Sequence, residues 1–181
     1  SHGQKLFPFS LAAAAPRQPH EIWVGASNRW SPAAENLRTA PSAEGFIIRT
    51  GTDHLLLAGE GHRGTLYAVY DFLERHLGCR WFTPGVTRIP RREQIALRPI
   101  DERCAPAFEY REPYAFEAMD PDWAARNKSN GHFPEFGPHH GGGVRYALPF
   151  VHTFNELVPV EKYFDTHPEY FSEVKGVRVG H

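Results

Sequence analysis

The sequence predicts an α+β fold in which one helix packs on a small mixed sheet, followed by the start of a parallel βα architecture. Three observations lead to this prediction. Short β-prone apolar runs occupy much of the region before residue 60, and a helical apolar stripe comes directly after them. Beyond residue 105, strand-like and helix-like segments alternate. Apolar residues make up 41% of the 181 residues, so the chain is able to bury a core.

The predicted sheet begins at residues 20–25, HEIWVG, a β-prone run that ends in a glycine. Two further apolar runs, 44–50 and 53–59, are separated by Gly51 and Thr52. A two-residue connection with glycine between β-prone runs is typical of a tight turn. We therefore expect a β-hairpin at this place.

The stretch 64–85, GTLYAVYDFLERHLGCRWFTPG, predicts a helix that ends at a glycine and leads into a short strand, CRWF. Gly78 stands where a left-handed C-terminal cap belongs. Pro84-Gly85 predicts a turn, and residues 94–100 predict the last strand of the sheet. We interpret this stretch as scaffold rather than active site. The predicted core face of the helix has residues at i, i+3, i+4, i+7 and i+11, namely Leu66, Val69, Tyr70, Leu73 and Leu77.

A domain limit is predicted near residues 99–107, where the chain is polar and flanked by prolines. The predicted parts are a poorly defined N-terminal segment at 1–20, a small α+β domain at 21–104, and a partial βα segment at 105–181. No internal repeat is apparent.

Within the last segment, residues 108–114, FEYREPY, and 150–154, FVHTF, are strand-like. Between them, residues 120–131 predict a helix with Asp120 as the N-cap and Pro121 at the first helical position. A long loop precedes the second strand, and helical turns are expected after residue 160. An eight-stranded barrel needs about 250 residues, so this segment is too short to close one.

Several motifs resemble known families. RGTLYAVYDFLERHLGCRWFTPG resembles the end of the small domain that precedes the barrel in family 67 α-glucuronidases. Three later motifs, PAFEYREPY, DPDWAARNKSNG and FVHTFNELVPVEKYFDTHPEYF, resemble the bacterial family called domain of unknown function 4838, whose members are similar to α-glucuronidases in layout. The resemblance covers roughly residues 20–181. It implies a (β/α)8-like catalytic barrel, of which this chain would contain the first βα units.

The resemblance also implies that the catalytic carboxylates lie on middle and late barrel strands, so we expect them to be absent from this chain and its catalytic residues stay unknown. Glu109 and Glu112 are separated by three positions, which places them on opposite faces of a strand. We interpret them as solvated or salt-bridged carboxylates.

Two residues are candidates for substrate binding, because each would lie at the ligand-facing end of a barrel-like strand. The guanidinium of Arg111 is suited to a sugar hydroxyl or a uronic carboxylate. The alternative is an ion pair with a nearby glutamate, which would be Glu109, Glu112 or Glu117. His152 is the second candidate, and the alternative for it is a buried histidine bonded to a backbone carbonyl.

The histidines at positions 132, 139, 140, 152 and 167 raise the possibility of a metal site. GPHHGGG reads as a loop, adjacent histidines rarely bind one ion together, and no established histidine–glutamate metal motif occurs. We therefore expect no metal and no cofactor. Cys79 and Cys104 are interpreted as free thiols, with a disulfide between them as the alternative.

The net charge of −1 argues against a nucleic-acid partner, and no apolar run is long enough to span a membrane. The compartment stays open, with an extracellular or periplasmic location favoured.

The leading hypothesis is that this chain is the N-terminal portion of a glycoside-hydrolase-like enzyme. Such an enzyme would act on polysaccharide fragments, including fragments that bear uronic acids. We expect the isolated chain to have little hydrolytic activity. A second hypothesis is a self-contained carbohydrate-binding or assembly module, with Trp30, Trp123 and Tyr146 stacking on sugars. A third is a metal-dependent enzyme that uses the histidine-rich loop. Unpaired strand edges at FEYREPY and FVHTF also predict a homo-oligomer.

Overall fold

A computed structural model describes residues 18–26, 44–146, 151 and 153–180 of the chain. The chain divides into two compact units, Ser1–Val144 and Arg145–His181, and each is described by itself. The predicted limit near residue 104 falls inside the first unit. The separate folding of residues 105–181 stays a prediction.

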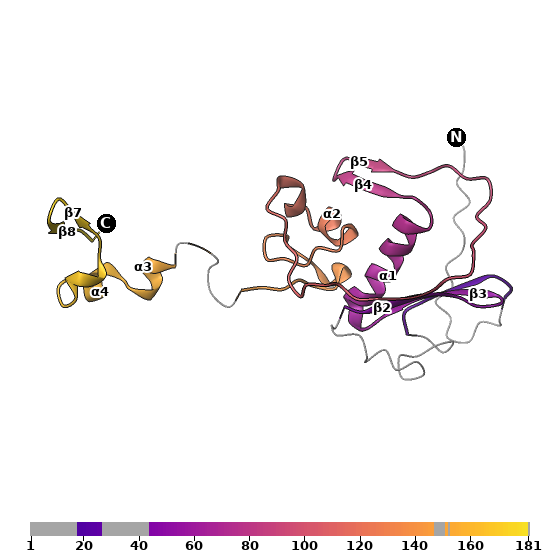
Figure 1. Cartoon of the computed structure of the whole chain (residues 1–181), viewed down its shortest axis with the longest axis horizontal. Coiled ribbons are helices and arrows are strands. Elements are labelled where there is room, and N and C mark those ends of the chain that lie inside the picture. The colour runs from indigo at the N-terminus through magenta and orange to yellow at the C-terminus, as the bar shows by residue number, and fades with distance from the viewer. Residues whose placement is uncertain (1–17, 27–43, 147–150, 152, 181) are drawn as a thin grey trace. The chain divides into compact units, whose positions relative to one another are not determined.

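A four-stranded mixed sheet forms the base of the first unit (Figure 1). The strand order is β1-β3-β2-β6; β1 runs parallel to β3, and the other pairs are antiparallel. The predicted strand at 20–25 and the predicted hairpin are confirmed. The four strands are β1 (Glu21–Val24), β2 (Phe46–Thr50), β3 (His54–Gly59) and β6 (Asp101–Cys104).

The last strand of this sheet begins later than the sequence predicted. Residues 94–100 contain no strand, and residues 91–99 are exposed to solvent. Pairing with β2 starts at Asp101, whose carboxylate accepts a hydrogen bond from Arg49 Nε at 2.8 Å. The prediction for 94–100 was wrong because residues 94–99 pack against no neighbouring strand; only Ile100, which is buried and bonded to Thr50, reaches β2.

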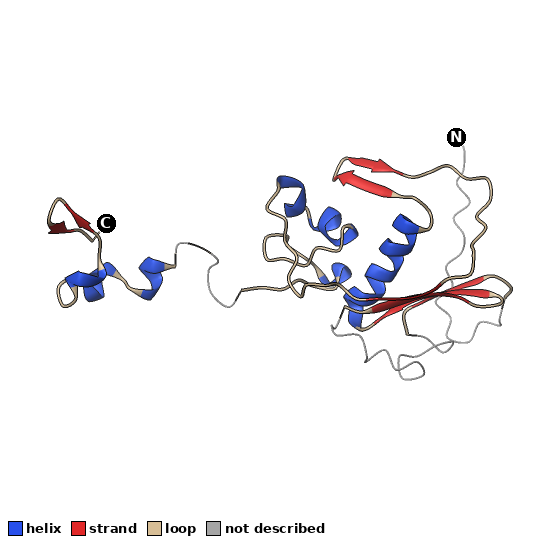
Figure 2. Cartoon of the chain, in the orientation of Figure 1, coloured by secondary structure: helices blue, strands red, loops and turns tan. Residues whose placement is uncertain are grey.

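The helix α1 (Gly61–Arg75) lies on one face of the sheet (Figure 2), as predicted. The core between the two layers contains Phe46, Ile48, Leu55, Leu57 and Phe72, among others. Gly78 has the predicted left-handed backbone, with φ +78°.

The buried face of α1 differs from the predicted stripe. It consists of residues at i, i+3, i+4, i+7 and i+8, namely Gly64, Tyr67, Ala68, Asp71 and Phe72. The predicted stripe counted only large apolar side chains, whereas small residues bring this helix close to the sheet. A Cβ on Gly64 would lie 2.6 Å from the carbonyl oxygen of Gly45, so only glycine fits there. The helix therefore turns Gly64 and Ala68, together with Tyr67 and Phe72, towards the strands in place of the predicted leucines.

The hairpin β4 (Arg80–Thr83) and β5 (Val86–Arg88) follows α1 and forms a separate two-stranded sheet. The predicted strand and the turn at Pro84-Gly85 are confirmed, but this strand does not join the four-stranded sheet. The helix α2 (Pro121–Arg126) is tied to β4, because the indole N–H of Trp123 donates to the carbonyl oxygen of Trp81 at 3.0 Å.

The N-terminal cap of α2 is the predicted one: the Asp120 carboxylate accepts a hydrogen bond from the backbone N–H of Trp123 at 2.7 Å. The helix is shorter than predicted, since it ends at Arg126 rather than near Gly131. The short 3-10 helices η3 (Phe116–Met119) and η4 (Pro138–His140) stand before and after it.

Residues 108–114 do not form the predicted strand. Their backbone is paired with a loop instead: Arg111 N donates to the side chain of Asn130 at 2.9 Å, and Asn130 N donates to Arg111 O at 3.1 Å. This segment therefore presents no strand edge to another chain, and the edge argument for an oligomer does not apply to it.

The described residues of the second unit form three short helices and one small hairpin. Phe154 belongs to a helix and Val151 to no strand, so the strand predicted at 150–154 is wrong for the residues described there. Phe171 is buried, and the rings of Phe154 and Phe164 each meet its ring edge to face. The elements are α3 (Phe154–Leu157), α4 (Val160–Tyr163), η5 (Pro168–Tyr170), β7 (Glu173–Val174) and β8 (Val177–Arg178).

The described residues of the two units are mixed α/β, with small sheets and few helices, and they contain no closed barrel. A search of the helices in the same residues finds none with the length and apolar character that a membrane crossing requires.

Candidate functional site

Glu44 is the centre of a buried polar network in the first unit. Its side chain is 5% exposed, and its carboxylate accepts hydrogen bonds from Arg63 Nε at 2.5 Å, Arg111 Nη2 at 2.6 Å and Asn130 Nδ2 at 2.9 Å. A buried charge is stable only when it is paired and hydrogen-bonded. These bonds therefore hold α1 and residues 108–130 against the start of β2.

Arg111, a predicted substrate-binding residue, directs its guanidinium into this network. Its Nε donates to Lys128 O at 2.8 Å, and its Nη1 donates to Phe108 O at 2.6 Å. Its ion-pair partner is Glu44, which lies 67 residues earlier in the chain. The side chain is 18% exposed, so it packs between segments rather than standing free at a surface. A ligand role for Arg111 stays a prediction.

Tyr67 completes the network from α1. Its hydroxyl accepts a hydrogen bond from Arg111 Nη2 at 3.3 Å and donates one to Ser129 O at 3.4 Å. Burial raises the pKa of Tyr67 to about 12, and the negative charge of Glu44 acts in the same direction. The hydroxyl therefore stays protonated at neutral pH and holds the helix to the loop.

His152, the other predicted substrate-binding residue, lies outside the described residues. Glu112 has a defined place: its carboxylate accepts hydrogen bonds from the backbone N–H of Phe133, at 2.6 Å, and from the hydroxyl of Tyr110. Gly131 lies directly beneath this carboxylate, and an added Cβ there would be 2.2 Å from Glu112 Oε1. Glu112 thus fixes the loop that follows α2.

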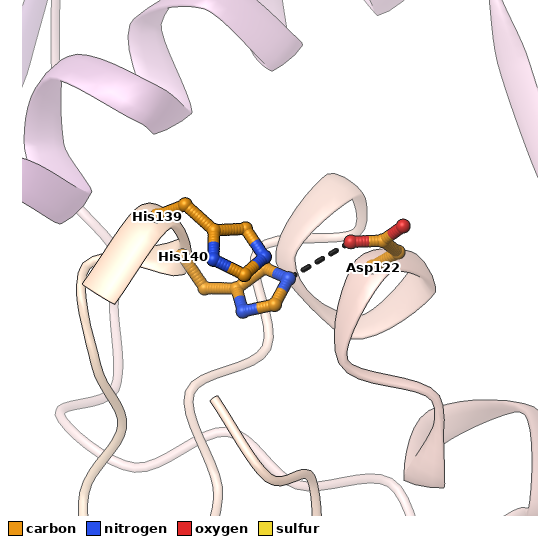
Figure 3. Close-up of side chains that lie close together, drawn as sticks. All are labelled: Asp122, His139 and His140. Atoms are coloured by element: carbon orange, nitrogen blue, oxygen red, sulfur yellow. Dashed lines mark hydrogen bonds and ion pairs between the residues drawn. The ribbon is translucent and has the colours of Figure 1, made fainter. Parts of the chain in front are cut away.

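Asp122, His139 and His140 come together although His139 lies 17 positions after the aspartate (Figure 3). His140 is buried, and its Nε2 lies 2.8 Å from Asp122 Oδ1. Its Nδ1 accepts a hydrogen bond from the backbone N–H of Gly137 at 3.0 Å, so the proton of the neutral ring is on Nε2. The hydrogen bond from His140 holds the pKa of Asp122 below its usual range, and Arg126 adds to this effect.

A shallow open groove of about 320 Å³ lies beside this cluster, between α1 and the η4 turn. His139 belongs to both features. The groove is open to solvent and is lined by apolar and polar side chains together. Its lining includes Val24, His62, Leu66, Tyr70 and His139.

Tyr114, Phe116 and Phe133 are called the aromatic surface here. The first two residues precede α2 in the sequence, and Phe133 follows it. These side chains are 81%, 89% and 36% exposed, and the rings of Tyr114 and Phe133 meet edge to face at 5.6 Å. Phe116 follows Tyr114 by two positions, and exposed apolar side chains that lie near one another commonly mark a binding surface. Trp123, by contrast, has its indole N–H bonded to Trp81, Tyr146 is 40% exposed, and Trp30 lies outside the described residues.

A protein-family model described as domain of unknown function (DUF4838) matches residues 81–180. The chain belongs to the DUF4838 family. Searches of curated proteins and of solved structures each found no match.

The DUF4838 match begins at Trp81. It therefore includes Arg111, the aromatic surface and the Asp122–His139–His140 cluster, while Glu44 and α1 come before it. Sequence reasoning missed Glu44 as the partner of Arg111 and Asp122 as the partner of His140. Neither pairing has a local signal, because a contact between distant residues leaves no spacing pattern in the sequence.

Proposed function

We propose that this DUF4838 protein is carbohydrate-active, as the N-terminal portion of a glycoside-hydrolase-like enzyme, and that the part described here binds saccharide without cleaving it. The resemblance of three ordered motifs to a family similar to α-glucuronidases supports the carbohydrate class. The same resemblance supports a (β/α)8-like barrel as the architecture to which residues 105–181 belong. A uronic-acid-bearing oligosaccharide is the first substrate class to test.

The aromatic surface is the observation that carries the proposal. Aromatic side chains offer large, rigid apolar faces at a low cost in conformational entropy. The apolar face of a pyranose ring is suited to such a surface, and its hydroxyls need polar groups at the edge. The phenol of Tyr114 supplies one, and the loop that carries Phe133 is held in place by Glu112.

Calorimetric titration against neutral xylo-oligosaccharides and aldouronic acids tests the proposal, together with an aryl-glycoside hydrolysis assay. We expect micromolar binding and no turnover. Tyr114→Ala combined with Phe116→Ala should weaken binding at least about fivefold, because removal of an anchoring aromatic side chain commonly costs more than about 1 kcal/mol. Phe82→Ala is the matched control, since Phe82 is an aromatic residue of β4 that is 58% exposed. Its affinity should equal that of the unmodified chain.

Three outcomes would contradict the proposal in different ways. Turnover of a glycoside would show that the chain is catalytic. Absence of binding to every saccharide would remove the carbohydrate class. Unchanged affinity in the double variant would move the site away from the aromatic surface.

Self-association is the competing use of this surface, and a homo-oligomer stays a prediction. Light scattering coupled to size exclusion decides between the two uses. A mass of 20.5 kDa at all concentrations is expected if the aromatic surface serves a saccharide. A dimer that is lost in the double variant would assign the surface to a second copy of the chain.

A further inference from the structure

We propose that Asp122, His139 and His140 form a binding site for a divalent first-row transition ion such as Zn²⁺. The site would lie at the rim of the groove that His139 helps to line. This proposal is independent of the saccharide proposal, because it uses none of the residues of the aromatic surface.

The donor set is the first argument. Two imidazoles and one carboxylate are the ligand types that zinc and its neighbours in the first row prefer. One ligand atom from each residue lies within 4.8 Å of the other two. Two ligands of one tetrahedral zinc ion lie about 3.4 Å apart, given bond lengths of about 2.1 Å. Closure of the longest separation by up to about 1.4 Å would bring all three onto one ion, and the exposed side chains of Asp122 and His139 are the ones with room to move.

The geometry of the turn is the second argument. Adjacent histidines rarely bind one ion together, which was one of the reasons to expect no metal here. In the η4 turn the centroids of the two rings lie 3.8 Å apart with the rings tilted at 44°, and Figure 3 shows a nitrogen of each ring on the side of Asp122. Gly141 and Gly142 follow the pair with φ of +78° and +73°. This left-handed backbone suits glycine and reverses the chain directly after the histidines.

Access to solvent is the third argument. The side chain of Asp122 is 59% exposed, and His139 is an exposed residue, whereas His140 is buried. An ion held by three protein ligands keeps at least one position for water or a ligand, as open zinc sites do. That position would face solvent beside the groove, where an oxygen donor of a small ligand is able to reach it.

The proton on His140 sets the expected affinity. Metal binding at Nε2 displaces the proton that this nitrogen donates to Asp122, and the proton moves to Nδ1. Nδ1 then no longer accepts the hydrogen bond from Gly137, which is lost. Because binding costs this bond and uses only three ligands, we expect a micromolar dissociation constant for Zn²⁺ rather than a nanomolar one.

The test is calorimetric titration of the chelator-treated chain with zinc chloride, and with cobalt chloride to read the coordination from the visible absorption of Co²⁺. We expect one strong equivalent of Zn²⁺. His139→Gln and Asp122→Asn should each weaken binding at least tenfold, since even loss of an outer-shell partner costs about 10- to 100-fold. Both residues are exposed, so both variants should fold, which circular dichroism checks. His140→Gln is not used, because the ring is buried and bonded at both nitrogens.

His167→Gln is the matched control. His167 also lies beside a carboxylate, with Nδ1 3.1 Å from Glu169 Oε1, and it is no member of the proposed site. Its affinity for Zn²⁺ should be unchanged. The proposal is overturned if the unmodified chain takes up no stoichiometric metal, or if His139→Gln and Asp122→Asn bind Zn²⁺ as tightly as the unmodified chain does.

Discussion

Removal of the Glu44 side chain should destabilise the first unit severely. The carboxylate of Glu44 is 5% exposed and accepts hydrogen bonds from Arg63, Arg111 and Asn130. In Glu44→Ala, the guanidinium of Arg111 would remain largely buried with no carboxylate beside it. Breaking a buried ion pair by removing one partner costs about 3–5 kcal/mol. In a unit of this size that corresponds to a fall in Tm of on the order of 10 °C.

Urea denaturation followed by tryptophan fluorescence measures this cost as a change in the free energy of unfolding. Glu109→Gln is the control, because Glu109 is an exposed neighbour of Arg111 and one of the partners suggested by the sequence. A surface substitution of this kind should change stability by no more than about 0.5 kcal/mol. If Glu44→Ala costs less than about 1 kcal/mol, or if Glu109→Gln costs as much, the network does not hold Arg111 as described.

Three further outcomes are expected. Gly59→Ala should cost at least about 1–3 kcal/mol, because its Cβ would lie 2.1 Å from the backbone carbon of Gly64; wild-type stability in urea would contradict the close approach of α1. The raised pKa of Tyr67, about 12 against an unfolded value of about 10, should contribute stability that is present below pH 10 and lost as the pH rises to 12. Tyr67→Phe should lack that loss in thermal melts at pH 9–12. Asp120→Ala should cost about 1 kcal/mol by removing the bond from Trp123 N, and a full helical signal at unchanged Tm would refute the cap.

Local features were predicted well from the sequence. The hairpin of β2 and β3, the helix α1, the left-handed Gly78 and the Asp120 cap all depend on residues within a few positions of one another. Their signals are backbone preferences and short-range hydrogen bonds. These depend on the local sequence and not on what packs against it.

Three predictions failed for a common reason. The core face of α1 depends on how closely Gly64 approaches the sheet, and the strands expected at 94–100 and 108–114 depend on a neighbour to pair with. An apolar or β-prone run becomes a strand only where another strand offers its backbone groups. Whether a neighbouring strand is present depends on the tertiary structure and not on the run itself.

The sequence by itself determined the small mixed sheet with a packed helix, the hairpin, the left-handed Gly78, the Asp120 cap, and the resemblance that led to the DUF4838 family. Only the tertiary structure decided which partners the polar residues have. It pairs Arg111 with Glu44 and His140 with Asp122, across 67 and 18 positions of the chain. The physical reason is that burial makes an unpaired charge or polar group costly, so each must find a partner wherever the fold brings one within reach. No spacing rule in the sequence specifies that meeting.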